Sequence, residues 1–336
     1  MLKFDTLTVL IAQCLLYISI IWHMDGKQHR SLHSKQSQLL LDVGCPQVQV
    51  PLDPPVVYPP KKVFHFLKEA GHGIGNMQPP QFWDDIDNQR NLLIIDVGAC
   101  DGGDWSIPAV QKRGHTVLAF EPVNAERFRN QIKGNGMLDR FTEIPVKAGS
   151  LPEFPSSFLT PASSIPRYPL GGQGHIYFFE SCVSSSTSKV SMYSSHELAS
   201  MVPQDFHSAE GFGNAQSVDI PALRLDTIVA QDVHLLKIDT QGHEYGVLLG
   251  AQKLFEQYRV NMVELEFWPK GMAQGGSNAV QVLEFLHSHG FICFDYSKNM
   301  HIPANRPSDF EGFVKQFTVS DDKFGLWEEL LCYNVS

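Results

Sequence analysis

The sequence predicts an α/β fold in which a mostly parallel sheet is covered by helices on both faces. Two observations support this prediction. Short apolar runs alternate with segments of helical periodicity from residue 91 onward. Several of these runs, such as 91–97, are apolar along most of their length without alternating polar residues, which is typical of strands buried on both faces. Alternation of strand and helix favours parallel neighbours, because each helix returns the chain to the same end of the sheet.

The first elements surround a glycine-rich loop. Residues 91–97 (NLLIIDV) form the first buried strand, and GACDGG follows it. Residues 106–113 are predicted to form a short helix. Pro108 is compatible with this prediction, because proline is tolerated in a first helical turn. The apolar run 116–120 (TVLAF) is the second strand. Asn124 is predicted to cap a polar helix that ends near residue 133.

The later elements repeat the pattern. Residues 176–183 (IYFFESCV) and 235–238 are apolar runs and are predicted to be strands. Residues 244–257 carry an apolar stripe at helical spacing. The chain then continues with strands at 260–267, 291–296 and 329–334 and a helix at 280–287.

The composition excludes several classes of protein. The 336 residues include 26 lysines and arginines and 36 aspartates and glutamates, for a formal net charge of −10. We expect no nucleic-acid partner, because phosphate neutralisation needs clustered basic residues. No two of the 6 cysteines form a CxxC pair, and we expect no metal site. Cys182, Cys293 and Cys332 lie in apolar runs and are predicted to be buried free thiols.

Residues 1–24 are predicted to be a signal anchor or a signal peptide. The run 7–22 is apolar and uncharged; with its neighbours it is long enough to span a membrane. No small-residue cleavage site follows it, which favours an uncleaved anchor. Basic residues follow the run, so the positive-inside rule favours a cytosolic domain. A location in the secretory pathway implies a lumenal domain instead, and both orientations remain open.

The rest of the chain divides into a stem and one domain. Residues 25–60 are predicted to be a proline-rich linker, because DPPVVYPP cannot be helical. Residues 61–336 are the predicted globular domain, with long loops at 149–174 and 200–217. We therefore expect a single-pass membrane protein of the Golgi or endoplasmic reticulum, which is secreted if the N-terminal segment is cleaved.

The glycine-rich loop and a later carboxylate together predict a nucleoside-type cofactor. Asp96 ends the first strand, and Gly98 and Gly102 allow a tight turn with close approach of a ligand. About 25 residues later, Glu121 ends the second strand, where a carboxylate can accept hydrogen bonds from both ribose hydroxyls.

Two cofactor classes compete for this loop. Dinucleotide-binding loops have the spacing GxGxxG, which is absent here. Asp96 and Asp101 would also repel a pyrophosphate placed at the helix N-terminus. The same acids suit the sulfonium and ammonium groups of S-adenosylmethionine. The charges therefore favour a methyl donor, and a nucleotide-dependent oxidoreductase is the disfavoured alternative.

An ordered set of motifs makes the prediction more specific. The segments are FEP at 120–122, LDT at 225–227, LKIDTQGHE at 236–244, VLLGA at 247–251 and ELE at 264–266. In this order they resemble the FkbM family of S-adenosylmethionine-dependent methyltransferases, over about residues 90–335. The resemblance implies a class I methyltransferase fold, which is Rossmann-like and has a seven-stranded sheet with its last strand antiparallel. Cys100 stands where the family often has asparagine.

The resemblance also implies which residues bind the cofactor. The loop would hold the methionine end, Glu121 the ribose, and the residues after the third strand the adenine. The implied cofactor-binding residues are Asp96, Gly98, Ala99, Cys100, Asp101, Gly102, Glu121, Pro122, Glu180, Ser181 and Asp239.

Members of the family are typically O-methyltransferases, and a hydroxyl acceptor benefits from a base that removes its proton. The candidate catalytic residues are Asp239, His243, Glu264 and Glu266. Glu264 and Glu266 are two positions apart on one strand and share a face. Structural roles remain open for each, including a loop-bracing role for Asp96 and pairing within the sheet for Glu264 and Glu266.

We therefore expect a membrane-anchored methyltransferase that acts on a hydroxyl of a sugar, a glycan or a small molecule. The alternative is a binding module that retains the fold but has lost catalysis. The set of cofactor motifs discriminates between the two, and it is intact in this sequence.

Overall fold

The computed structural model describes residues 88–159, 164–195, 198–200, 216–295, 300–302, 307–318 and 325–335. All of them belong to the compact unit Pro59–Ser336. The predicted anchor and stem, and most of the predicted loop 200–217, lie outside the described residues. None of the described helices is long and apolar enough to cross a bilayer.

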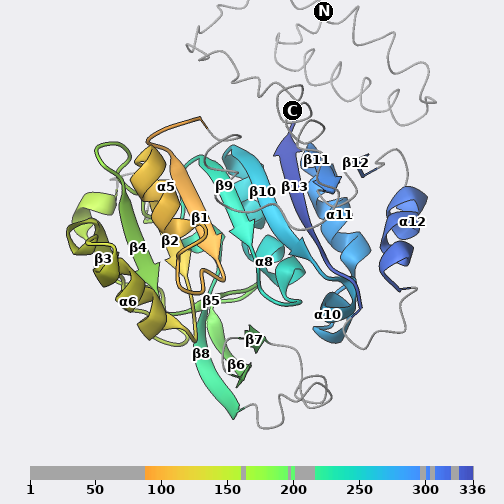
Figure 1. Cartoon of the computed structure of the whole chain (residues 1–336), viewed down its shortest axis with the longest axis horizontal. Coiled ribbons are helices and arrows are strands. Elements are labelled where there is room, and N and C mark those ends of the chain that lie inside the picture. Colours follow the sequence, from red (N-terminus) through yellow and green to blue (C-terminus); the bar gives the residue numbers. More distant parts are fainter. Residues whose placement is uncertain are drawn as a thin grey trace, which may run out of the picture. The chain divides into compact units, whose positions relative to one another are not determined.

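A nine-stranded sheet forms the centre of the described fold, in the order β12-β11-β13-β10-β9-β1-β2-β4-β3 (Figure 1). The strands are β1 (Leu93–Val97), β2 (Thr116–Phe120), β3 (Phe141–Glu143), β4 (His175–Phe179), β9 (Val233–Ile238), β10 (Val260–Phe267), β11 (Phe291–Asp295), β12 (Met300–His301) and β13 (Glu328–Asn334). β13 runs antiparallel to β10 and β11, and β12 runs antiparallel to β11. The mostly parallel sheet with an antiparallel last strand is therefore confirmed, and β3 and β12 add a short strand at each edge.

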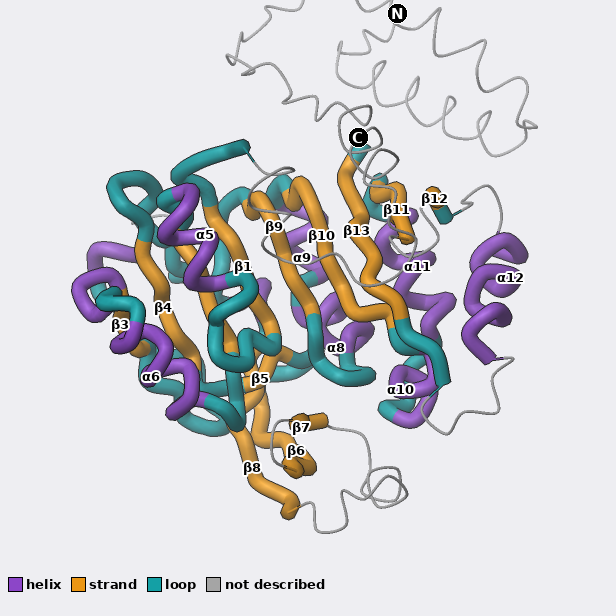
Figure 2. The backbone as a smooth tube through the Cα atoms, viewed as in Figure 1, coloured by secondary structure: helices purple, strands orange, loops and turns teal. Residues whose placement is uncertain are grey.

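Helices cover both faces of this sheet (Figure 2). One face carries α5 (Ser106–Arg113) and α6 (Ala125–Gly134), and the other carries α8 (Glu244–Gly250), α9 (Gln252–Gln257), α11 (Ala279–Ser288) and α12 (Pro307–Thr318). Phe128 of α6 stacks on Phe178 of β4, with ring centroids 4.6 Å apart. On the other face, the ring of Phe313 of α12 packs against the ring of Phe267 of β10, with centroids 5.7 Å apart. The remaining short helices are α10 (Pro269–Gln274), η2 (Leu138–Arg140), η3 (Ser156–Phe158) and η4 (Leu225–Thr227).

A second sheet follows β4, in the order β5-β8-β6-β7. Its strands are β5 (Cys182–Val183), β6 (Ser188–Ser195), β7 (Leu198–Ser200) and β8 (Gln216–Leu223). The prediction of one strand over 176–183 is wrong, because the chain turns at Glu180, where Ser181 N donates to Phe179 O at 2.8 Å. Residues on both sides of this turn are buried and apolar, so hydrophobicity alone did not reveal the change of sheet.

The predicted helix 244–257 is likewise divided. α8 ends before Ala251, whose N–H donates to Leu248 O at 3.0 Å, and α9 begins at Gln252. Gly250 lies at the break, where an added Cβ would come within 2.1 Å of Ser184 O. The end of α8 therefore packs directly on the backbone that follows β5.

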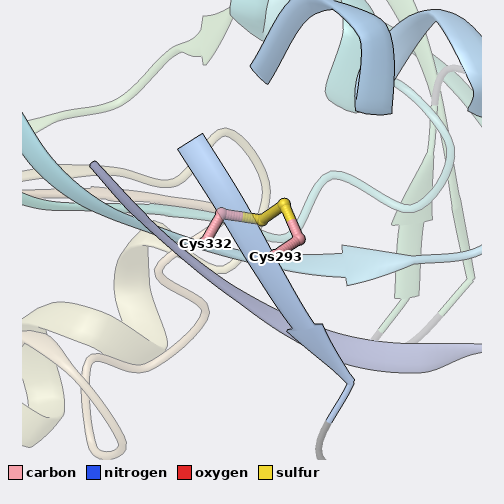
Figure 3. Close-up of a disulfide and its surroundings, with 2 residues drawn as sticks. All are labelled: Cys293 and Cys332. Carbon is pink, nitrogen blue, oxygen red and sulfur yellow. A yellow bond between two sulfur atoms is a disulfide. The ribbon is translucent and has the colours of Figure 1, made fainter. Parts of the chain in front are cut away.

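The cysteine prediction is wrong for two of the three residues. Cys293 of β11 and Cys332 of β13 face each other in the antiparallel register and form a disulfide (Figure 3). They are 39 positions apart in the sequence, and they meet only because β13 lies next to β11. Cys182 is a buried free thiol, as predicted, and Cys100 is also free.

Candidate active site

A pocket lies where β1, β2 and β9 end, with part of its wall supplied by β5 and β6 of the second sheet. It is lined by Val97, Gly98, Cys100, Phe120, Glu121, Pro122, Asn124, Cys182, Val183, Met192, Asp239, Thr240, Gln241 and His243. This is the edge at which open α/β sheets bind ligands. Six of the residues singled out from the sequence are in this wall, namely Gly98, Cys100, Glu121, Pro122, Asp239 and His243.

The loop after β1 is pressed against the turn after β9. Gly98 has φ +79°, and a Cβ at this position would lie 1.8 Å from the carbonyl oxygen of Asp239. Gly102 has φ +74°, and a Cβ there would lie 2.6 Å from the ring of Phe128. Cys100 adopts φ +50° between them. Glycine is therefore required at 98 and 102 both by the backbone conformation and by the lack of space.

Glu121 organises the backbone around the pocket. Its Oε2 accepts a hydrogen bond from Cys100 N at 2.9 Å, and its Oε1 accepts from Val123 N and Asn124 N at 2.8 Å each. The predicted side-chain cap at Asn124 is wrong, since that side chain makes no cap hydrogen bond. Burial raises the pKa of Glu121, and the three backbone donors act against this shift. A carboxylate has about four acceptor positions, so Oε2 keeps capacity for one more donor.

Asp96 lies behind the loop and not in the pocket wall. Its Oδ2 accepts from Ser106 Oγ at 2.6 Å, and its Oδ1 is 3.5 Å from Lys237 Nζ. Lys237 Nζ also donates to Gly98 O at 2.7 Å and lies 3.6 Å from Asp239 Oδ2. Lys237 was not among the residues predicted from the sequence, although a single formal charge within the apolar strand VHLLKI was a signal for it.

Gln241 is a second residue of the site that was not predicted from the sequence. Its Nε2 donates to Asp239 Oδ1 at 2.8 Å and to Glu266 Oε2 at 2.9 Å. Its backbone has φ +53°, an uncommon conformation for a residue other than glycine. The bridge orients Asp239, whose side chain is 37% exposed and lines the pocket.

Glu264 and Glu266 lie on β10, beside the pocket and not in its wall. Burial raises the pKa of Glu266 well above its ordinary value, and Asp239 and Glu244 add to this effect. Burial also raises the pKa of Glu264 well above its ordinary value, and the carboxylate of Glu329 on β13 adds to this effect. Both carboxyl groups therefore bind a proton more tightly than exposed glutamates do.

Four other predicted residues lie near the loop or after β4 but outside the pocket wall. Ala99 and Ser181 are buried. Asp101 pairs with Arg127 at 3.1 Å. Glu180 is 55% exposed and accepts from Arg129 Nη2 at 2.5 Å. The wall on this side consists instead of Cys182, Val183 and Met192.

His243 occupies the N-cap position of α8 and lines the pocket. Its Nε2 is 3.0 Å from Ser184 Oγ. Burial lowers the pKa of His243, which favours the neutral imidazole. The ring fits because residue 246 is a glycine, where an added Cβ would lie 2.3 Å from both Cε1 and Nε2 of the imidazole.

Gly246→Ala is expected to displace His243 and to lower the free energy of unfolding by about 1–3 kcal/mol, through overpacking. Gly312→Ala is the matched control, because Gly312 lies within α12 and a Cβ there would contact nothing within 4 Å. This control is expected to stabilise the protein by about 0.5–1 kcal/mol. Urea unfolding of both variants measures the difference, and equal stabilisation by the two would contradict the packing argument.

Glu244 is fully buried at the start of α8, and its Oε1 accepts from Thr240 N, Thr240 Oγ1 and Gly242 N at 3.1 Å each. Burial raises the pKa of Glu244 from 4.5 to about 7. The folded state therefore binds the proton more tightly than the unfolded state. The stabilising contribution is complete below pH 4.5 and is lost as the pH rises to about 7.

Glu244→Gln is expected to remove this loss, because an amide oxygen can accept the same three hydrogen bonds. Between the two pKa values, the free energy of unfolding of the wild type should fall by about 3 kcal/mol relative to the variant. Glu256→Gln, at an exposed position of α9, should show no such change. Urea unfolding across this pH range is the measurement, and parallel pH profiles for wild type and Glu244→Gln would refute the prediction.

The pocket fits S-adenosylmethionine. Glu121 keeps an acceptor position that suits a ribose hydroxyl, and Phe120, Val183 and Met192 form an apolar wall that suits an adenine. Asp239 supplies negative charge that suits a sulfonium. In the part of the chain that the structure describes, no group of His, Cys, Asp and Glu side chains is arranged to hold a metal ion.

The chain is similar to several solved structures at low sequence identity. Methyltransferase FkbM from Methylobacillus flagellatus KT is 12% identical, with a TM-score of 0.40 over 80% of this chain and 50% of that one, so this chain spans about half of its length. SMU.1697c from Streptococcus mutans, solved in complex with SAH, is 9% identical, with a TM-score of 0.38 and coverages of 78% and 100%. A methyltransferase from Geobacter sulfurreducens is 12% identical, with a TM-score of 0.33 and coverages of 90% and 96%.

The match to a protein-family model identifies the family of this chain. No curated protein matches the chain. The model of the methyltransferase FkbM domain matches residues 96–293, which is more than half of the 336 residues. The matched range begins at Asp96, near the end of β1, and includes the glycine-rich loop and every residue of the pocket wall. The chain therefore belongs to the FkbM family of S-adenosylmethionine-dependent methyltransferases.

Proposed function

We propose that this domain transfers a methyl group to a hydroxyl of a sugar, a glycan or a small molecule. The observation that supports the proposal is the position of Asp239 and His243. Both line the same pocket as the glycine-rich loop, and each can accept a proton from a hydroxyl group. An alcohol needs such an acceptor as it attacks, because its own proton must leave.

Different residues of the site would bind different parts of the cofactor. The loop from Gly98 to Gly102 would hold the methionine end, Glu121 the ribose, and Met192 with Val183 the adenine. When bound, S-adenosylmethionine supplies a methyl group activated by the positive sulfur. The remaining contribution of the protein is to hold the acceptor oxygen in line with that methyl group.

Asp239 is the residue we assign to orient the acceptor and to take its proton. Gln241 donates to Oδ1 at 2.8 Å, and Lys237 lies 3.6 Å from Oδ2, so both oxygens are held before an acceptor arrives. Such preorganisation keeps the carboxylate in reacting geometry at little entropic expense. His243 is the second proton acceptor in the pocket wall, since burial favours its neutral form.

The test is to incubate the full chain with S-adenosylmethionine and a panel of glycosides, free sugars, aliphatic alcohols and amines. The expected result is SAH formation together with an O-methylated product, identified by mass spectrometry and NMR. Asp239→Asn should reduce turnover by about 10²-fold or more. Asp219→Asn, at an exposed carboxylate of β8 that pairs with Lys189, should retain full turnover.

Two outcomes would contradict the proposal. Methylation of amines alone would assign a different acceptor class. Binding of SAH without transfer to any member of the panel would favour the alternative, a binding module that retains the fold.

We further propose that residues 1–24 anchor the protein and place the domain in the lumen of the secretory pathway. The disulfide between Cys293 and Cys332 supports this proposal, because disulfides persist mainly in oxidising compartments. Protease treatment of microsomes that contain the full chain is the test. Protection of the domain is expected, and digestion without detergent would argue for a cytosolic orientation.

A further inference from the structure

Lys237 lies at the centre of a row of charged side chains that crosses three strands. It pairs in register with Asp96 of β1 on one side and with Glu264 of β10 on the other. Parallel register places these three side chains on the same face of the sheet. The side chain of Lys237 is only 7% exposed, so its ammonium group is balanced by protein groups and not by bulk solvent.

The ammonium group joins two parts of the pocket that are far apart in the sequence. Nζ donates to Gly98 O at 2.7 Å, across 139 positions of the chain. It also lies 3.5 Å from Asp96 Oδ1 and 3.6 Å from Asp239 Oδ2. A buried cation in contact with a carbonyl and two carboxylates forms strong, charge-assisted contacts. Lys237 thus ties the cofactor loop to the turn that carries Asp239.

The surrounding carboxylates keep Lys237 charged. Burial alone would lower its pKa, but Asp239, Asp96, Glu264 and Glu329 together outweigh this effect and raise the pKa above its ordinary value. One permanent positive charge therefore offsets the acids beside the pocket.

We propose that Lys237 is a positioning residue whose positive charge limits the preference of the pocket for the sulfonium of S-adenosylmethionine over the thioether of SAH. The two ligands share their nucleoside and amino-acid groups. They differ only in the methyl group and in the positive charge that the sulfur atom carries when it is methylated. Interactions with the shared groups cancel in the ratio of the two dissociation constants. The ratio therefore reports the net charge that surrounds the sulfur atom.

This inference rests on the cofactor and not on the acceptor, so it can hold even if the acceptor is not a hydroxyl. Without Lys237, Asp96 and Asp239 would attract the sulfonium more strongly, while the loop would lose its contact at Gly98 O. Binding of SAH should weaken from the second effect alone. Binding of S-adenosylmethionine should weaken less, because the uncompensated carboxylates favour its charge.

The experiment is calorimetric titration of the full-length protein with each ligand separately. For Lys237→Met, SAH affinity should fall about tenfold, as expected for loss of a charge-assisted contact. The ratio Kd(SAH)/Kd(S-adenosylmethionine) should rise about fivefold or more. Lys237→Arg keeps the charge, and its ratio should stay within about twofold of that of the wild type. Lys253→Met, at an exposed position of α9, controls for loss of a distant lysine and should leave the ratio unchanged.

Asp239→Asn provides the opposite change and an independent test if Lys237→Met fails to fold. It removes a negative charge and keeps the lysine, so the ratio should fall by about threefold or more. Equal weakening of both ligands by Lys237→Met would overturn the proposal, because a purely structural lysine gives that result. The same shift in Lys237→Arg as in Lys237→Met would also overturn it, and so would an unchanged ratio in Asp239→Asn. If the wild type bound neither ligand, this inference and the proposed function would both fail.

Discussion

Gly98→Ala is expected to abolish cofactor binding and to lower the free energy of unfolding by about 4 kcal/mol or more. An alanine Cβ would lie 1.8 Å from the carbonyl oxygen of Asp239, so the backbones that follow β1 and β9 would have to separate. That separation would disrupt the hydrogen bond from Asp239 N to Val97 O, now 3.0 Å long. It would also move Gly98 O away from Lys237, which donates to it at 2.7 Å.

Gly136→Ala is the control that distinguishes the steric clash of the added Cβ from the conformational penalty of a positive φ. Gly136 has φ +66°, close to the +79° of Gly98, but a Cβ at position 136 would contact nothing within 4 Å. Its replacement should therefore cost only the conformational penalty, about 1–2 kcal/mol. Urea unfolding and SAH titration of both variants measure the two effects. A Gly98→Ala protein that is as stable as Gly136→Ala and still binds SAH would show that the close approach at Asp239 is not a constraint.

Glu121→Ala is expected to weaken SAH binding by about 10²-fold or more, because two losses coincide. The carboxylate that suits the ribose is removed, and the N–H groups of Cys100, Val123 and Asn124 lose their acceptor. Each buried donor left without a partner costs about 1–3 kcal/mol. The free energy of unfolding should therefore fall by about 3 kcal/mol in the absence of ligand, since water can reach some of these donors.

Glu126→Ala is the matched control, at an exposed position in the first turn of α6. It should change stability by less than about 1 kcal/mol and leave SAH affinity intact. Calorimetry and thermal unfolding are sufficient to compare the variants. Unchanged SAH affinity in Glu121→Ala would mean that this carboxylate has no part in cofactor binding, and the assignment of the ribose position would have to be abandoned.

Local patterns in the sequence were enough to predict most of the central sheet. The strands predicted at 91–97, 116–120, 235–238 and 260–267 correspond to β1, β2, β9 and β10, which are buried along nearly their whole length. Their hydrophobicity has to be continuous, because helices cover both faces. The predicted helix at 106–113 matches α5. Such elements depend on residues that are close in sequence, which is why a single sequence reveals them.

The second sheet could not be predicted in the same way. β6 (SKVSMYSS) is rich in serine and has no continuous apolar run, so it resembled a loop. β5 has only two residues and continues the apolar run of β4, which concealed the turn at Glu180. The consequence for function is direct, because Met192 of β6 and Val183 of β5 form part of the pocket wall.

Local sequence patterns were sufficient to predict the class of fold, the glycine-rich loop and the set of polar residues at the ends of the strands. It could not determine which of those residues share the pocket. Asp96 lies behind the loop, Asp239 lines the pocket, and Glu266 reaches Asp239 only through Gln241. These positions, and the pairing of Cys293 with Cys332, depend on how the strands assemble into the sheet. The physical reason is the order of the sheet, which places β9 beside β1 and β13 between β10 and β11. Contacts such as that of Lys237 with Gly98 join residues 139 positions apart, and no local periodicity encodes them.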